Sequence, residues 1–298
     1  MKILYINIII LISTISTFAK IIDTNHTVLK YKNIIILSDL SSRLRNQKPK
    51  DIDAINKILS YFRNQCVQPG QKIGDKSSIY FSVFSNNTLS SINHIDLDEI
   101  KDLGQKQSFV NSKGPFLNKG LDHKIDLLKK SILNQYSNTK NPGLDLISQL
   151  VEKIQNEQGI LIKENKNISA GNNSKSLHFE NHIFLFTDGY LEFQTKNASS
   201  EFYFGKIQIQ KLRNYCLANH IDIKTALRNT QSLGIPKVFN PKNNLINLHI
   251  LETHERDKDI KTQTYKNPLG FRDNEILEAV WRKWAIESGF KSFEWKKY

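Results

Sequence analysis

The chain has 298 residues, of which 39% are hydrophobic, so it can bury the core of one large α/β domain or of two small ones. Its two cysteines are too few for a disulfide-rich scaffold or for a cysteine-ligated zinc site. Lysine and arginine number 42 against 29 acids, but no dense basic block with interleaved aromatics occurs, so we do not favour a nucleic-acid partner.

The first 20 residues, MKILYINIIILISTISTFAK, have the layout of a secretory signal peptide. An apolar stretch runs from Ile3 to about Ile15, and Thr17 and Ala19 occupy the positions that a signal peptidase reads. We therefore predict a signal peptide over residues 1–19 and an exported protein, periplasmic or secreted. Polar residues shorten the apolar run below the roughly 20 residues of a membrane span, and no later stretch is long enough to span.

A fully buried strand is predicted where the aliphatic residues 34–37 follow one another without alternation. Residues 51–64 carry apolar side chains at three- and four-residue spacing, which indicates an amphipathic helix. Aromatic and β-branched residues at 77–85 predict a second strand. The chain therefore begins with the strand, helix, strand order that is typical of α/β folds.

The alternation of predicted strands and helices becomes less clear over residues 86–122, which we interpret as an elaboration of the same domain. We expect a short strand at 88–94 and a short helix near 97–103 within it. Two amphipathic helices follow, at 123–136 and 143–157, and a Pro-Gly pair separates them.

The second half repeats the alternation of strands and helices. Residues 163–177 are polar and rich in asparagine, so we expect a flexible surface loop there. A buried strand is predicted within 182–193, a helical region with one break at 205–228, another strand at 244–255, and a last helix at 274–290.

This order of elements predicts a single α/β domain over residues 20–298, built on a doubly wound, mostly parallel central sheet with helices on both faces. Ligands of such sheets bind at the carboxyl ends of the strands. Asp39 and Asp188 each follow a buried run, and hydroxyl side chains lie beside them. Carboxylates and hydroxyls at neighbouring strand ends are oxygen ligands that suit Mg²⁺.

The stretches ILSDLSSRL, at 36–44, and FLFTDG, at 184–189, together resemble the von Willebrand factor type A family. In that family the first strand ends in an Asp-x-Ser-x-Ser signature and the fourth in a Thr-Asp-Gly or similar turn. The order of elements over residues 31–290 also suits the family. The resemblance implies a binding module with a metal-ion-dependent adhesion site.

The resemblance assigns this site to residues of three segments. Asp39 and Ser41 match the first acid and the first serine of the signature, and Asp188 matches the distant acid. Ser42 and Asp145 are weaker candidates for metal ligands, and Thr187 is a weaker candidate for contact with a partner.

Arg43 departs from the family pattern, because it stands where the second serine belongs. A guanidinium cannot bind a cation, but it can neutralise Asp39 and Asp188 from the metal's position or contact a partner. Two alternatives therefore remain open: an Mg²⁺ site, or a metal-free descendant of one that Arg43 plugs.

We predict a non-enzymatic module that binds a protein partner through a rim formed by residues 38–46, 139–146 and 187–195. One alternative is a metal-dependent hydrolase of phosphoesters or nucleic acid, which the basic charge and the paired acids favour. The other is a structural subunit of an envelope assembly that makes its contacts through residues 86–122.

Other catalytic chemistry finds no support in the sequence. No Gly-x-Ser-x-Gly turn or phosphate-binding glycine-rich loop is present, and no two histidines have ligand spacing on a predicted helix. Cys66 and Cys216 form either a disulfide bridge or two buried thiols.

Overall fold

The computed structural model describes residues 26–41, 48–67, 75–84, 93–138, 143–156, 161–170, 173–193, 201–252, 255–259 and 261–297. The predicted signal peptide, Ser42 and Arg43 lie outside these residues. The strands are β1 His26–Ser38, β2 Ser78–Val83, β3 Asn93–Asp96, β4 Lys166–Ala170, β5 Asn173–Thr187, β6 Ile246–Glu252 and β7 Ser292–Lys297. The main helices are α2 Lys48–Tyr61, α3 Leu103–Val110, α4 Leu121–Asn138, α5 Leu146–Asn156, α6 Lys206–Asn219, α7 Ile223–Asn229 and α8 Asp273–Glu287.

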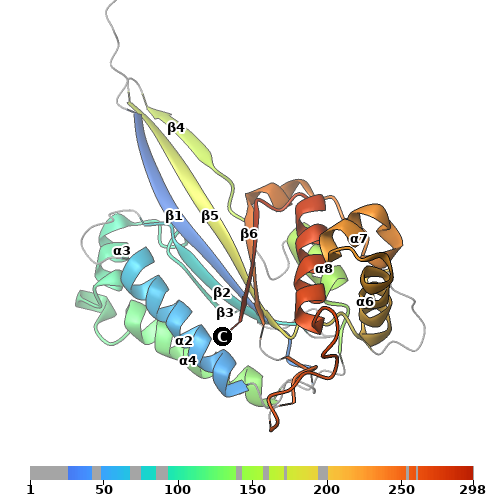
Figure 1. The fold of residues 1–298 in the computed structure, drawn as a ribbon. Coiled ribbons are helices and arrows are strands. Elements are labelled where there is room, and N and C mark those ends of the chain that lie inside the picture. Colours follow the sequence, from blue (N-terminus) through green and yellow to red (C-terminus); the bar gives the residue numbers. More distant parts are fainter. Residues whose placement is uncertain are drawn as a thin grey trace, which may run out of the picture. The chain divides into compact units, whose positions relative to one another are not determined.

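The strands form one mostly parallel sheet in the order β3-β2-β1-β5-β6-β7, and β4 pairs with β5 off this path (Figure 1). β1 is parallel to β2, and β5, β6 and β7 are parallel to one another, whereas β3 and β4 are antiparallel to their partners. The predicted doubly wound α/β fold is therefore confirmed.

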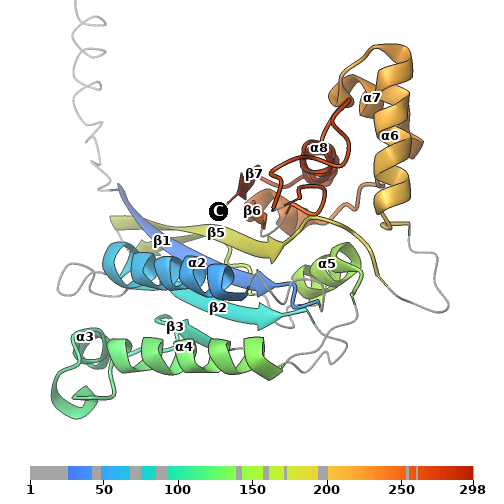
Figure 2. The ribbon, with the colours of Figure 1, turned by 60° about the horizontal axis from the view of Figure 1, so that its bottom comes forward.

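Two hydrophobic cores lie on opposite faces of this sheet because the side chains of a strand alternate between its faces. In β1, Ile35 and Leu37 belong to the core that α5, α6, α7 and α8 complete. Ile34 and Ile36 belong to the core that α2, α3 and α4 complete. Figure 2 shows α6–α8 grouped near β6 and β7, with α2 and α4 along the strands β1 to β3. Burial on both faces explains the uninterrupted aliphatic run of β1.

The described residues divide into a small and a large compact unit. The small unit contains residues 26–30 and 165–178, where β4 pairs with the first part of β5. The large unit contains the other described residues, including all the helices.

Two expectations at the level of elements were wrong, and one strand was missed. Residues 163–177 contain two paired strands instead of a loop, because backbone hydrogen bonds pair them although their side chains are polar and mostly exposed. The short helix expected near 97–103 is α3, which begins at Leu103 where Asp102 caps it. The edge strand β7 was missed because its sequence, SFEWKK, is largely polar.

Cys66 and Cys216 are buried thiols and form no bridge with each other. Within the part of the chain that the structure describes, no helix has the length and apolar character needed to cross a membrane.

Candidate functional site at the carboxyl ends of β1 and β5

Asp39 lies where β1 ends beside β5. Its backbone N–H donates to the carbonyl oxygen of Phe186 at 2.9 Å. Its carboxylate accepts the backbone N–H of Ser41 at 3.0 Å through Oδ1. Thr187 Oγ1 lies 3.4 Å from its other oxygen, Oδ2, and donates to it. Asp39 is thus held between its own turn and the end of β5, and only 1% of it is exposed.

Asp188 follows β5 in a tight turn. The Thr187 hydroxyl accepts the N–H of Gly189 at 3.1 Å, and Asp188 Oδ1 accepts the N–H of Tyr190 at 3.2 Å. Gly189 has a φ of +79°, a left-handed conformation that favours glycine. Trp281 of α8 donates from Nε1 to the Gly189 carbonyl at 2.8 Å and fixes the turn.

These two strand ends meet at the point where the strand order reverses. After β1 the chain adds β2 next to one edge of β1, and it later adds β5 next to the opposite edge of β1. In doubly wound sheets this switch point is where ligands bind. The prediction that the ends carrying Asp39 and Asp188 converge is confirmed.

A guanidinium that the sequence analysis did not identify neutralises Asp188. Arg256 lies in the segment after β6, and its Nε is 2.9 Å from Asp188 Oδ2. This contact is an ion pair without hydrogen-bond alignment, because Arg256 Nε has no hydrogen-bond partner. The guanidinium carbon lies 3.4 Å from the centroid of the Tyr190 ring, and Nη1 donates to Glu192 Oε2 at 2.7 Å. Since Asp188 is fully buried, this charge compensates a carboxylate that water cannot reach.

A second layer of polar contacts supports the stacked ring of Tyr190. Its hydroxyl donates to Asp273 Oδ2 at 2.6 Å, and Arg213 forms an ion pair with the other oxygen of Asp273. The N–H of Asp273 donates to Asp257 Oδ2 at 2.9 Å. Burial, followed by the hydrogen bond to Asp273, raises the pKa of Tyr190 well above its ordinary value. Tyr190 therefore acts as a neutral donor that joins the β5 turn to α8.

On the β2 side of Asp39, a buried tyrosine completes the site. The hydroxyl of Tyr136 in α4 lies 2.8 Å from Ser38 Oγ and 3.3 Å from Asp51 Oδ2 and hydrogen-bonds to both oxygens. Burial, followed by the negative charge of Asp51, raises the pKa of Tyr136 well above its usual value. Neither Tyr136 nor Asp51 of α2 was predicted as part of the site.

The oxygen donors at this edge fit an Mg²⁺ ion only in part. The Ser41 hydroxyl is buried with no hydrogen-bond partner among the described residues, as expected beside a ligand or water. Asp188, however, already has a positive partner in Arg256. Asp145 caps α5. Its Oδ1 accepts the backbone N–H of Ser148 at 3.0 Å, and its Oδ2 accepts the Ser148 hydroxyl at 2.7 Å. A helix cap is thus the role that its hydrogen bonds show.

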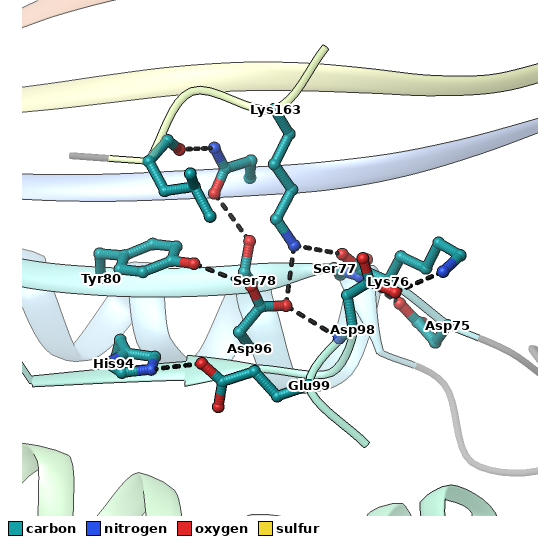
Figure 3. Close-up of polar contacts among 12 residues, drawn as sticks. Asp75, Lys76, Ser77, Ser78, Tyr80, His94, Asp96, Asp98, Glu99 and Lys163 are labelled. Carbon is teal, nitrogen blue, oxygen red and sulfur yellow. Dashed lines mark hydrogen bonds and ion pairs between the residues drawn. The ribbon is translucent and has the colours of Figure 1, made fainter. Parts of the chain in front are cut away.

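A second polar cluster, also missed by the sequence analysis, lies at the amino end of β2 (Figure 3). Lys163 Nζ lies 2.7 Å from Asp96 Oδ1 and donates to the Lys76 carbonyl at 2.9 Å. Tyr80 donates to Asp96 Oδ2 at 2.8 Å. Lys163 and Asp96 are 8% exposed each, so they form a buried ion pair in which each charge compensates the other. Its position, away from the carboxyl ends of the parallel strands β1 and β5, suits a structural role.

Among the described residues, no group of three or more histidine, cysteine, aspartate or glutamate side chains is arranged to hold a metal ion. The chain matches no model of a known protein family and no curated protein sequence.

Proposed function

We propose that the chain is an exported, non-enzymatic protein-binding module, similar in plan to von Willebrand factor type A domains. In this proposal the partner docks on the rim at the carboxyl ends of β1 and β5. Asp39 and Asp188 shape that rim from inside, and Arg256 supplies the positive charge that a divalent cation provides in the adhesion-type site. Binding would therefore not require Mg²⁺.

The observation that carries the proposal is the buried ion pair of Asp188 and Arg256. Asp39 and Asp188 are 1% and 0% exposed, so neither presents its carboxylate to a partner or a substrate. A metal-dependent hydrolase needs acids that can reach a metal ion. Here Asp39 accepts a hydrogen bond from Thr187 instead, and Asp188 pairs with Arg256. The geometry therefore favours a binding surface over a reaction centre.

An aromatic pair beside the site supplies a candidate contact surface. Phe193 follows the β5 turn, and its ring packs edge-on against Tyr203 with centroids 5.4 Å apart. Tyr203 is 38% exposed, and the neighbouring Phe204 pairs with Leu191 next to the turn. Aromatic side chains that a partner can cover are enriched at the energetic centres of protein interfaces.

The test is cross-linking of the purified protein in an extract of the source cells, followed by mass spectrometry of the captured proteins. We compare wild type with the double variant Phe193→Ser/Tyr203→Ser. The matched control is Leu127→Ser/Leu133→Ser on α4, where both leucines are exposed. All three proteins are tested with EDTA and with MgCl₂.

We expect a partner that wild type and the α4 control capture equally with EDTA or MgCl₂, and that the rim variant loses at least tenfold. If the rim variant captures the partner as well as wild type does, the interface lies elsewhere on the protein. If EDTA abolishes capture, binding depends on a divalent cation, and the proposal that Arg256 takes the place of that cation is wrong.

A further inference from the structure

Two histidines that are far apart in the sequence meet on one face of the sheet, away from the site described above. His182 of β5 and His249 of β6 are diagonal neighbours, because His182 lies opposite Asn247 and His249 lies opposite Phe184. His182 Nδ1 lies 3.0 Å from His249 Nε2. Their side chains are 21% and 15% exposed, so the pair is partly shielded but reachable from solvent.

A carboxylate stands behind each imidazole. His249 Nδ1 donates to Glu294 Oε2 of β7 at 2.8 Å, and this hydrogen bond leaves a lone pair on His249 Nε2. On the other side, Glu180 Oε2 lies 3.8 Å from His182 Nε2. The inner nitrogens thus face each other and the outer nitrogens face carboxylates. For His249 this is the arrangement that orients histidine ligands in metal sites, where the second ring nitrogen donates to a carboxylate. Glu180 Oε2 is too far from His182 Nε2 for a hydrogen bond and also pairs with Lys32 Nζ.

The spacing of the inner nitrogens suits one cation held between them. Imidazole nitrogens bind such metals at about 2.0–2.1 Å, so nitrogens 3.0 Å apart would subtend an angle of roughly 90–100° at the ion. Cis ligands of a tetragonal Cu²⁺ or Ni²⁺ ion make such an angle. In the apo protein, the proton on His182 Nδ1 donates to His249 Nε2. When a metal binds, that proton moves to His182 Nε2, which faces Glu180, so neither imidazole has to lose a net proton.

We propose that His182 Nδ1 and His249 Nε2 form a binding site for a late first-row divalent cation, with water completing the coordination. Cu²⁺ binds most tightly in this series because the affinity of a nitrogen site rises toward copper. The protein supplies two ligands here, and among the described residues no third histidine, cysteine or acid completes the set. The inference goes beyond the proposed protein-binding function and does not depend on it.

Packing and protonation both prepare the pair for a metal. Phe184 stacks on the His249 ring with centroids 4.6 Å apart, and the two histidine rings are 5.3 Å apart, so packing restrains both rings. Burial and the neighbouring His249 lower the pKa of His182 to about 4. Burial also lowers the pKa of His249. Both imidazoles are therefore neutral at pH 7, the form in which histidine binds metals.

The test is titration of the full chain with CuCl₂ at pH 7, read by electron paramagnetic resonance and by calorimetry. The variants are His182→Gln, His249→Gln and Glu294→Gln. The matched control is His94→Gln, because His94 also pairs with a glutamate at 2.9 Å and stacks on a tyrosine but has no second histidine beside it.

We expect one tight Cu²⁺ site in wild type, with hyperfine splitting from two nitrogens. Each histidine variant should weaken this site at least tenfold, Glu294→Gln should weaken it about 10–100-fold, and His94→Gln should leave it unchanged. If a histidine variant fails to fold, protection of His182 and His249 in wild type from diethyl pyrocarbonate by Cu²⁺ replaces it. A wild-type spectrum without nitrogen splitting, equal affinity in the folded histidine variants, or no protection would overturn the proposal.

Discussion

Asp188 shows how a single buried charge decides the character of the candidate site. A carboxylate that is 0% exposed needs a positive partner, and that partner can be a cation or a side chain. Here it is Arg256, whose position Tyr190 and Glu192 fix by stacking and by an ion pair. We propose that this internal ion pair takes the place of the cation expected at an adhesion-type site.

Replacing Arg256 with glutamine tests this ion pair. Removal of one partner of a buried pair leaves the other charge uncompensated, which costs about 3–5 kcal/mol in fully buried cases. Since the Arg256 side chain is 26% exposed, we expect a loss near the lower limit, about 3 kcal/mol, in urea unfolding. The double variant Arg256→Gln/Asp188→Asn should recover part of this loss. Single and double variants of equal stability would show that the pair does not neutralise Asp188.

The histidine pair predicts a specific dependence of stability on pH. The pKa of His182 is about 4 in the folded protein, against 6.5 for an unperturbed histidine. Between these values the unfolded chain binds more protons, so the stabilising contribution is complete above pH 6.5 and is lost as pH falls toward 4. The charged groups around the ring, Lys32 and Glu180 together with His249, are part of this shift.

We therefore expect His182→Gln to lose less stability than wild type when urea unfolding is compared at pH 7 and pH 4.5. The difference should be at most about 3 kcal/mol, which corresponds to the full shift in pKa. Equal losses in the two proteins would contradict a lowered pKa for His182.

The turn after β5 is the element on which the candidate site depends. Gly189 combines a φ of +79° with close packing, because a Cβ atom there would lie 2.4 Å from the ring of Trp295. Trp295 belongs to β7, so this contact ties the turn to the last strand. The turn therefore needs both the conformation and the small size of glycine.

Gly189→Ala and Gly289→Ala separate these two requirements. Gly289 has a similar φ of +86°, but a Cβ atom there would meet nothing within 4 Å. We expect Gly289→Ala to cost about 1 kcal/mol of unfolding free energy for backbone strain alone. Gly189→Ala should cost at least about 1 kcal/mol more, because the Trp295 ring must also move. Equal costs in urea unfolding would show that Trp295 does not constrain the turn.

Sequence patterns predicted the elements with a clear apolar run or stripe and missed those whose residues are mostly polar. β1 was recognisable because both of its faces are buried, which makes its aliphatic run continuous. β7 and the β4–β5 pairing are polar and partly exposed, so their backbone hydrogen bonds leave little trace in the side-chain pattern.

The candidate site also contains residues that could be predicted from the sequence and residues that could not. The meeting of Asp39 and Asp188 could be predicted because parallel strand ends share one edge of a sheet. Arg256 could not, because it lies in an irregular segment and reaches Asp188 only through the folded chain. The contact of His182 with His249 depends on the register of β5 and β6, which the sequence does not reveal.

At the scale of the whole molecule, the strand order explains why the polar residues gather where they do. The reversal between β1 and β5 brings two strand ends side by side, and helices on both faces bury their side chains. At this position Arg256 pairs with Asp188. We propose that this internal ion pair supports a binding rim.

A crystal structure of the wild-type protein in millimolar MgCl₂ tests this claim most directly. We predict that the Arg256 guanidinium lies against Asp188 and on the ring of Tyr190, with no ion at the ends of β1 and β5. An Mg²⁺ ion coordinated by Asp39, Ser41 and Asp188, with Arg256 displaced toward solvent, would contradict the account.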